Sequence, residues 1–197
     1  MNISRRFLAI GALAIATTSL GGCGYNTIPT KEEAAKAAWA EVQNQYQRRA
    51  DLVPNLVNVV KGYAKHEEQV LTEVTQARAN VAGLKVDKEV LEDPALFQKY
   101  QEAQAQMTGA LSRLIAVSEN YPDLKANEQF RDLQVQLEGT ENRIAVARNR
   151  YITTVQDFNS YSRQFPQVMT AKVIGMDTKP NFSAEQSAQK APTVSFN

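Results

Sequence analysis

Three long segments of the chain repeat apolar residues at alternating spacings of three and four. The segments run from Trp39 to Val81, from Leu96 to Tyr121 and from Phe130 to Phe165. A mean spacing of 3.5 keeps one stripe of a helix against a partner helix, and residues that favour helices dominate this part of the chain. The pattern predicts an all-α protein in which three long helices form an antiparallel bundle.

Prolines and polar residues mark the expected ends of these helices. The polar segment 83–93 leads to Pro94, which suits the first turn of the second helix. At 120–125, "NYPDLK", Pro122 stops the second helix and Asp123 is placed to cap the third. After Phe165-Pro166, residues Gln167 to Gly175 are expected to form a short fourth helix that the glycine closes.

The expected helices differ in length, which leaves part of the bundle uncovered. The first, Lys31 to Ala82, would be roughly 78 Å long, the third, Lys125 to Phe165, roughly 60 Å, and the second roughly 40 Å. The half of the first helix that carries Trp39 and Tyr46 therefore needs another cover. The candidates are the chain after Pro166, a partner protein or the membrane surface.

Pro54 lies inside the first apolar ladder, which keeps its phase across the proline. A proline removes one helical hydrogen bond, here to the carbonyl of Ala50, and clashes with that carbonyl. We expect a kink or a brief break at this point rather than a domain boundary. Asp51 is placed to cap a restarted helix, and Asn55 to bond the freed carbonyls.

The lone cysteine, Cys23, follows a short apolar segment at the N-terminus. Arg5 and Arg6 precede the uncharged run 7–20, which is shorter than the about 20 residues that cross a bilayer. This arrangement is typical of a secretory signal peptide, here residues 1–22. Its end, "LGGC", resembles the lipobox of bacterial lipoproteins, in which the cysteine is acylated. Two or three acyl chains hold a protein stably at a membrane.

Two questions about this N-terminus stay open. Cys23 carries the lipid, or it is a free thiol near an ordinary cleavage site or within an uncleaved anchor. The stretch "SRRFL" (4–8) is a plain basic segment, or a twin-arginine export signal that lacks the usual spacer residue. Gly24, rather than an aspartate, permits sorting to an outer membrane by analogy with enteric lipoproteins, so the choice of membrane is open as well.

Six stretches of the sequence together carry a family resemblance: "YNTI" (25–28), "RRADLVPNLVNVVKGYAKHE" (48–67), "AR" (77–78), "SENYPDLKANEQFRDLQVQLEGTENRIAVARNRY" (118–151), "FN" (158–159) and "FP" (165–166). They resemble the LemA family. The resemblance covers most of the chain from Tyr25 to about Phe182 and implies a membrane-associated protein with a long-helix, four-helix-bundle-like domain. It implies no known catalytic activity. Many members have a transmembrane helix where this chain has a lipobox.

Two charged residues, Arg49 and Glu67, stand in the otherwise apolar seam of the first helix. Charges at core positions are costly unless they are paired, and the third helix offers Glu141 and Arg148 as partners. One interpretation is a buried ionic layer that sets the helix register. The other is a site for a polar ligand or an ion inside the bundle.

The sequence provides little for catalysis or metal binding. His66 is the only histidine, and no Glu-x-x-His motif of the carboxylate-bridged bundles is present. No serine lies in a glycine-flanked elbow, and glycine-rich phosphate loops are absent. The formal net charge is +1 and about −1 once the two arginines of the leader are removed, so the chain lacks the basic charge typical of nucleic-acid-binding proteins. We therefore expect no enzyme activity, no cofactor and no metal.

These observations predict a lipoprotein of the bacterial cell envelope with its bundle outside the cytoplasm. Residues 1–22 form the leader, 23–30 a lipidated tether, 31–182 the helical bundle and 183–197 a flexible tail. The leading hypothesis is a non-catalytic interaction or scaffold module, held at the membrane by its lipid, whose partners are envelope or membrane proteins. The alternative is a module that binds a small polar ligand, a peptide or a lipid headgroup at the polar layer.

Overall fold

The computed structural model describes residues 25–84 and 88–183, and within these ranges the chain is helical without strands. The expected all-α class is confirmed. The leader 1–22, Cys23 and nearly all of the tail 183–197 lie outside the described residues. The elements are α2 (Thr27–Tyr63), α3 (Glu68–Gly83), the 3₁₀ helix η1 (Lys88–Leu91), α4 (Pro94–Ser118), α5 (Pro122–Ala126), α6 (Glu128–Arg163) and α7 (Gln167–Val173).

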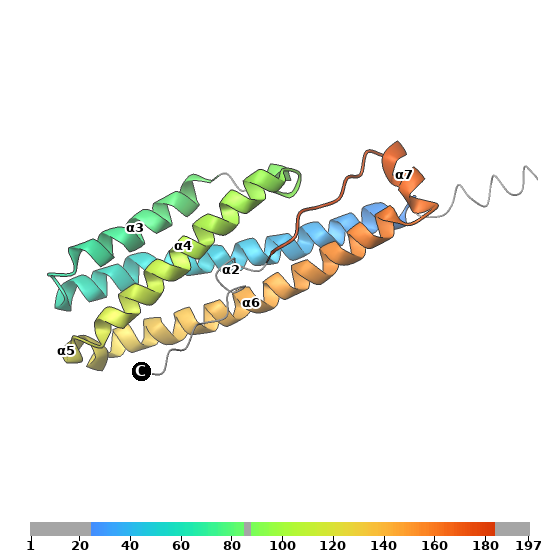
Figure 1. Cartoon of the computed structure of the whole chain (residues 1–197). Coiled ribbons are helices and arrows are strands. Elements are labelled where there is room, and N and C mark those ends of the chain that lie inside the picture. Colours follow the sequence, from blue (N-terminus) through green and yellow to red (C-terminus); the bar gives the residue numbers. More distant parts are fainter. Residues whose placement is uncertain (1–24, 85–87, 184–197) are drawn as a thin grey trace, which may run out of the picture.

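The longest helices, α2 and α6, lie side by side in opposite directions, and the shorter pair α3 and α4 lies against them (Figure 1). Helix α5 makes the corner between α4 and α6 at one end. At the other end α7 lies beside the start of α2, where Ile28, Phe158 and Ala171 form a small buried cluster. The successive long helices alternate in direction along one common axis.

The single first helix expected over Lys31–Ala82 is wrong. It is two helices, α2 and α3, joined by the turn 64–67, and α2 begins at Thr27 rather than Lys31. Because α3 folds back, Leu71, Val74 and Ala77 join the core that α2, α4 and α6 share. The spacing of three and four continues across the turn through Tyr63, Glu67 and Val70, although Ala64 and Leu71 are the residues buried there. The spacing alone therefore gives no sign of the reversal.

Short polar caps set the other helix boundaries. Pro94 occupies the first turn of α4, as expected, and the Asp93 side chain accepts hydrogen bonds from the next two free backbone amides. The expected cap of the third helix, Asp123, is wrong: α6 is capped by Asn127, whose Oδ1 accepts from the Phe130 amide at 2.9 Å. Residues 122–126 form the separate helix α5 instead. Gly175, with a φ of 69°, ends α7.

Pro54 does not break α2, which runs from Thr27 to Tyr63. The carbonyl that the proline leaves free, that of Ala50, accepts a hydrogen bond at 3.1 Å from Nε of Arg78 on α3. The expected cap and the expected bonds from Asn55 are therefore wrong. Asp51 lies within the helix and accepts from Gln47, and the donor comes from the neighbouring helix. A bend of the helix axis stays a prediction.

The core has two halves of different character. Aliphatic side chains dominate the half around α3 and α5, and aromatic rings dominate the half around Trp39. The residues after α7, here called the strap (176–183), cross the aromatic half and place Phe182 at 6.1 Å from Trp39, measured between ring centroids. The strap thus supplies the cover that the unequal helix lengths require, and Trp39 is only 4% exposed.

Polar contacts hold the strap in place. Lys179 Nζ lies 2.9 Å from Oε1 of Glu32, and both side chains are more than nine-tenths buried. Asn159 forms two hydrogen bonds with the backbone of Lys179, and the Tyr151 hydroxyl donates to the Pro180 carbonyl at 2.8 Å. The strap is therefore fastened to both α2 and α6 rather than loosely laid on them.

We predict that Arg78→Met lowers the free energy of unfolding by about 1 kcal/mol, because the Ala50 carbonyl loses its donor. In a Pro54→Ala background the backbone amide at 54 satisfies that carbonyl, so the same substitution should cost distinctly less. Urea unfolding of the native chain, the two single variants and the double variant measures the difference. An Arg131→Met variant, at an exposed position of α6, is the matched control. Equal costs in both backgrounds would contradict the assignment.

We also predict that the strap contact weakens in acid. Burial raises the pKa of Glu32, but hydrogen bonds and charge attraction from Lys179 and Lys36 outweigh it and leave this pKa below the ordinary value of 4.5. A depressed carboxyl pKa contributes stability above about pH 4.5 that is lost as the pH falls through the folded-state value. Unfolding free energies between about pH 6 and about pH 3 should fall more steeply in the native chain than in Glu32→Gln.

The neighbouring variant Glu33→Gln is the control for this experiment, because Glu33 also contacts Lys36 but is exposed and does not touch the strap. It should keep the acid dependence of the native chain. An unchanged slope in Glu32→Gln would show that the contact between Glu32 and Lys179 does not stabilise the fold.

Candidate functional site

A polar layer crosses the core where α2, α4 and α6 meet. Arg49 of α2 is 1% exposed. Its Nη1 donates to Glu141 Oε1 on α6 at 2.9 Å and to Thr108 Oγ1 on α4 at 2.7 Å. Its Nη2 donates to both the carbonyl and the side-chain oxygen of Gln104. One guanidinium thus links three helices.

The layer fixes how the helices align along their axis. A buried cation without its partners is strongly unfavourable, so sliding α4 or α6 by one turn would leave the guanidinium unpaired. Glu141 keeps partial access to water, with a side chain that is 37% exposed. The arrangement therefore has the features of a structural ionic layer whose acceptors come from two other helices.

The other two charged residues expected in this layer are not part of it. Glu67 lies in the turn between α2 and α3 and accepts a hydrogen bond from the Tyr121 hydroxyl at 3.0 Å, which raises the pKa of Tyr121. Arg148 stacks its guanidinium over the ring of Phe182 in the strap, 4.5 Å from the centroid. The structure brings together Arg49 and Glu141 and places Glu67 and Arg148 elsewhere.

The remaining chemistry-bearing residues do not converge on a catalytic arrangement. His66 is exposed in the turn after α2. In the ranges that the structure describes, no group of three His, Cys, Asp or Glu side chains has the geometry to hold a metal ion. Cys23, the expected lipidation site, lies outside these ranges.

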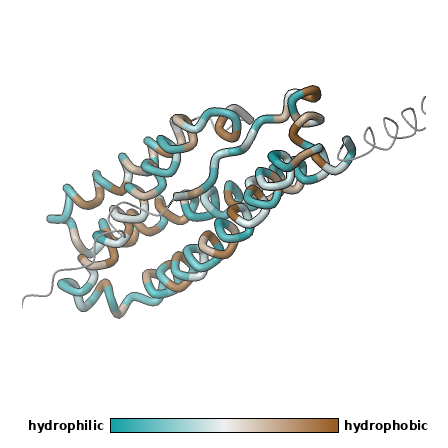
Figure 2. The backbone as a smooth tube through the Cα atoms, turned by 45° about the vertical axis from the view of Figure 1, so that its right-hand side comes forward, coloured by the Kyte–Doolittle hydropathy of each residue, from teal (hydrophilic) through white to brown (hydrophobic). Residues whose placement is uncertain are grey.

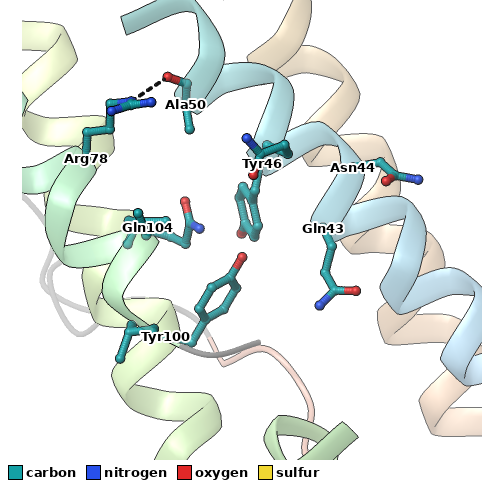
Figure 3. Close-up of a pocket in the computed structure, with 11 residues that line it drawn as sticks. Gln43, Asn44, Tyr46, Ala50, Arg78, Tyr100 and Gln104 are labelled. Atoms are coloured by element: carbon teal, nitrogen blue, oxygen red, sulfur yellow. Dashed lines mark hydrogen bonds between the residues drawn. The ribbon is translucent and has the colours of Figure 1, made fainter. Parts of the chain in front are cut away.

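A groove lies beside the polar layer, between α2, α3 and α4 (Figure 3). Its volume is about 370 Å³ and it is partly open to solvent. Gln104 contributes to both features, since its oxygen accepts from Arg49 and its side chain lines the groove. The groove is lined by Gln43, Asn44, Tyr46, Gln47, Ala50, Arg78, Val81, Ala82, Leu84, Tyr100 and Gln104.

The groove is rich in hydrogen-bond donors. Figure 3 shows the hydroxyls of Tyr46 and Tyr100 directed toward one another from facing helices. Burial raises the pKa of Tyr100 to about 12, against the opposing effect of the nearby Gln104 amide, and burial also raises the pKa of Tyr46. Both hydroxyls therefore stay protonated at neutral pH. Gln104 Nε2 and Arg49 Nε are buried and have no hydrogen-bond partner among the described residues.

Sequence reasoning missed the α4 contribution to this region. The expected ladder of the second helix, from Leu96 to Tyr121, is buried at Tyr100, Ala103, Met107, Ala110, Leu114 and Val117. Four further residues, spaced seven apart, are buried beside it: Phe97, Gln104, Leu111 and Ser118. A polar residue beside the apolar ladder was the signal that could have located Gln104.

The family model for the LemA family matches residues 38–196, which is most of the chain. The chain belongs to the LemA family. This result confirms the resemblance found in the quoted stretches, and the seam with Arg49 and the strap with Phe182 both lie within the matched range.

Curated relatives of this LemA family member are distant in sequence. Magnetosome protein MamQ 2 of Paramagnetospirillum magneticum is 24% identical over 188 residues, covering 86% of this chain and 68% of the relative. Magnetosome protein MamQ of Magnetospirillum gryphiswaldense is 24% identical over 95% of this chain and 75% of its own length. Protein LemA of Metamycoplasma hominis is 25% identical over 60% of this chain and 50% of its own length.

Among the described residues, no helix combines the length and the apolar character that crossing a bilayer requires.

We predict that Glu141→Leu lowers the free energy of unfolding by about 3 kcal/mol, because the buried Arg49 cation loses its counter-ion. Adding Arg49→Met should recover part of this loss, since the unpaired charge is then removed as well. Urea unfolding checks both values. Glu138→Leu, at an exposed position of the same helix, should change stability by no more than about 0.5 kcal/mol. Similar losses for Glu141→Leu and Glu138→Leu would show that the layer is not structural.

Proposed function

We propose that this LemA family chain is a non-catalytic interaction protein that a lipid on Cys23 holds at a bacterial envelope membrane, with its bundle outside the cytoplasm. The one observation that carries the proposal is a group of exposed hydrophobic residues at the end of the bundle where residues 1–24 join α2. We call this group the α7 end. It comprises Tyr25, Phe165, Met169 and Val173, which are 59%, 78%, 59% and 85% exposed.

The α7 end has the composition of a surface that rests on lipid. Figure 2 shows hydrophobic residues gathered along α7, and Met169 and Val173 lie one turn apart on the same helix. Tyrosine and phenylalanine suit the boundary between headgroups and acyl chains. Arg163 and Lys172 flank the patch as exposed cations, and basic residues are attracted to anionic headgroups.

A second weak contact with the bilayer complements a lipid anchor, because stable attachment generally takes two signals. The cysteine lies only a few residues before Thr27, the first residue of α2. An anchor at this position would bring the α7 end to the membrane and point the rest of α2 and α6 away from it (Figure 1). The geometry supports a rod that stands on the bilayer.

The proposed partner surface is the outer face of α6. Trp39 and Tyr46 are buried under the strap and within the core, so the aromatic half is not available to a partner. On α6, Val135 and Val146 are each 67% exposed, and the uncharged Gly139 and Asn142 lie between them at spacings of four, three and four. Such a stripe suits packing against a helix of an envelope or membrane protein.

The alternative function, ligand binding at the polar layer itself, is less well supported. The terminal nitrogens of Arg49 already donate to Glu141, Thr108 and Gln104. No N–H group of these two nitrogens is left to bind a ligand.

The test of the anchor is Cys23→Ser in the native host. We expect the mass of the acyl groups to be lost and the unprocessed chain to accumulate. The mature, lipid-bearing form should disappear from the membrane fraction. Ser19→Ala, within the same leader, is the matched control and should be processed normally. Unchanged mass, processing and fractionation in Cys23→Ser would overturn the lipoprotein proposal.

The same cells test the interaction surface when a photo-crosslinking residue replaces Val146. One specific protein adduct, absent when the crosslinker replaces the exposed Lys65 near the other end of α2, is the expected result. Adducts that are identical at both positions, or no protein adduct above background at residue 146, would overturn the α6 surface.

A further inference from the structure

The groove between α2, α3 and α4 contains binding groups that the polar layer does not use. We infer that this groove binds a small organic monocarboxylate. The inference goes beyond the proposed interaction role and does not depend on it, because it uses only residues of α2, α3 and α4 and requires no anchor.

The first observation is a buried donor without a partner. Gln104 is 4% exposed, and its Oε1 is held by Arg49, which fixes the orientation of the amide. The Nε2 of the same amide has no hydrogen-bond partner among the described residues, and in Figure 3 it is directed into the groove toward Tyr46. The Tyr100 hydroxyl lies close enough to interact with this amide but does not meet Nε2 with hydrogen-bond geometry. Buried amide donors are nearly always satisfied, so this one is placed to donate to a ligand oxygen.

The second observation is the charge of the lining. Arg78 is the one charged residue among the described residues that line the groove, and none of them is acidic. Its Nε is committed to the Ala50 carbonyl, and its terminal nitrogens form no ion pair with the described part of the chain. A guanidinium in the groove wall whose terminal nitrogens are not committed to an ion pair suits a carboxylate.

The remaining walls define the rest of the ligand. The Tyr46 and Tyr100 hydroxyls are protonated and add two neutral donors on the side of Gln104. Val81, Ala82 and Leu84 form an apolar wall on the side of α3. One cation with several neutral donors matches a single negative charge better than the two charges of a phosphate ester, and the volume of about 370 Å³ accommodates a molecule with a short apolar body.

The experiment uses butanoate as the probe, with the full chain in detergent and calorimetric titration as the readout. We expect saturable binding with a Kd below about 1 mM, and a shift of the fluorine resonances of Tyr46 and Tyr100 in 3-fluorotyrosine-labelled protein. Butanamide, which has the same shape without the charge, and inorganic phosphate should each bind at least about tenfold more weakly.

Two substitutions make the test specific. Gln104→Glu keeps an acceptor for Arg49 but replaces the free donor by a negative charge, so binding of butanoate should weaken at least about tenfold while the unfolding midpoint stays the same or rises. Arg78→Gln should weaken binding to a similar extent, and Arg131→Gln, an exposed position on α6, should leave it unchanged.

The proposal is overturned if butanoate does not bind saturably to the native chain, or if Gln104→Glu binds it as tightly as the native chain does. It is also overturned if butanamide or phosphate binds as tightly as butanoate, since the groove would then recognise shape alone or a different anion. None of these outcomes bears on the lipid anchor or on the α6 surface.

Discussion

The buried guanidinium of Arg49 is the interaction on which the arrangement of the long helices depends. Hydrophobic seams with a spacing of three and four hold helices together but leave their relative height free, because each turn resembles the next. Arg49 removes that freedom by taking acceptors from α4 and α6 at one level. The aliphatic half of the core then forms on one side of this level and the aromatic half on the other.

A second constraint comes from a residue that helices normally exclude. Pro54 leaves the Ala50 carbonyl without its helical donor, and Arg78 of α3 provides one from outside. The pairing of α2 with α3 thus includes a directional contact in addition to apolar packing. It also orients Arg78 along the wall of the groove, so that a defect in one helix positions a charged group of the next.

The sequence predicted the helical class, the start of the second helix at Pro94 and the need for a cover over Trp39, because these follow from spacing, proline chemistry and the unequal lengths of the helices. It did not predict the reversal at 64–67, since the spacing of three and four continues across the turn and the gain comes from packing Leu71 and Val74 against distant residues. The layer was found on α2 and α6 through charged residues in apolar seams. Its neutral members on α4, Gln104 and Thr108, carry no charge to reveal them.

The strap gives the bundle an unusual order of completion. Its anchoring residues, Lys179 and Phe182, lie close to the C-terminus, whereas their contacts Glu32 and Trp39 lie near the start of α2. Ribosomes make the chain from the N-terminus, so the cluster of rings stays exposed to water until the strap has emerged. Closure of the aromatic half therefore follows synthesis of the strap, and a chain cut before residue 176 would expose an aromatic surface that quality-control proteases and chaperones recognise.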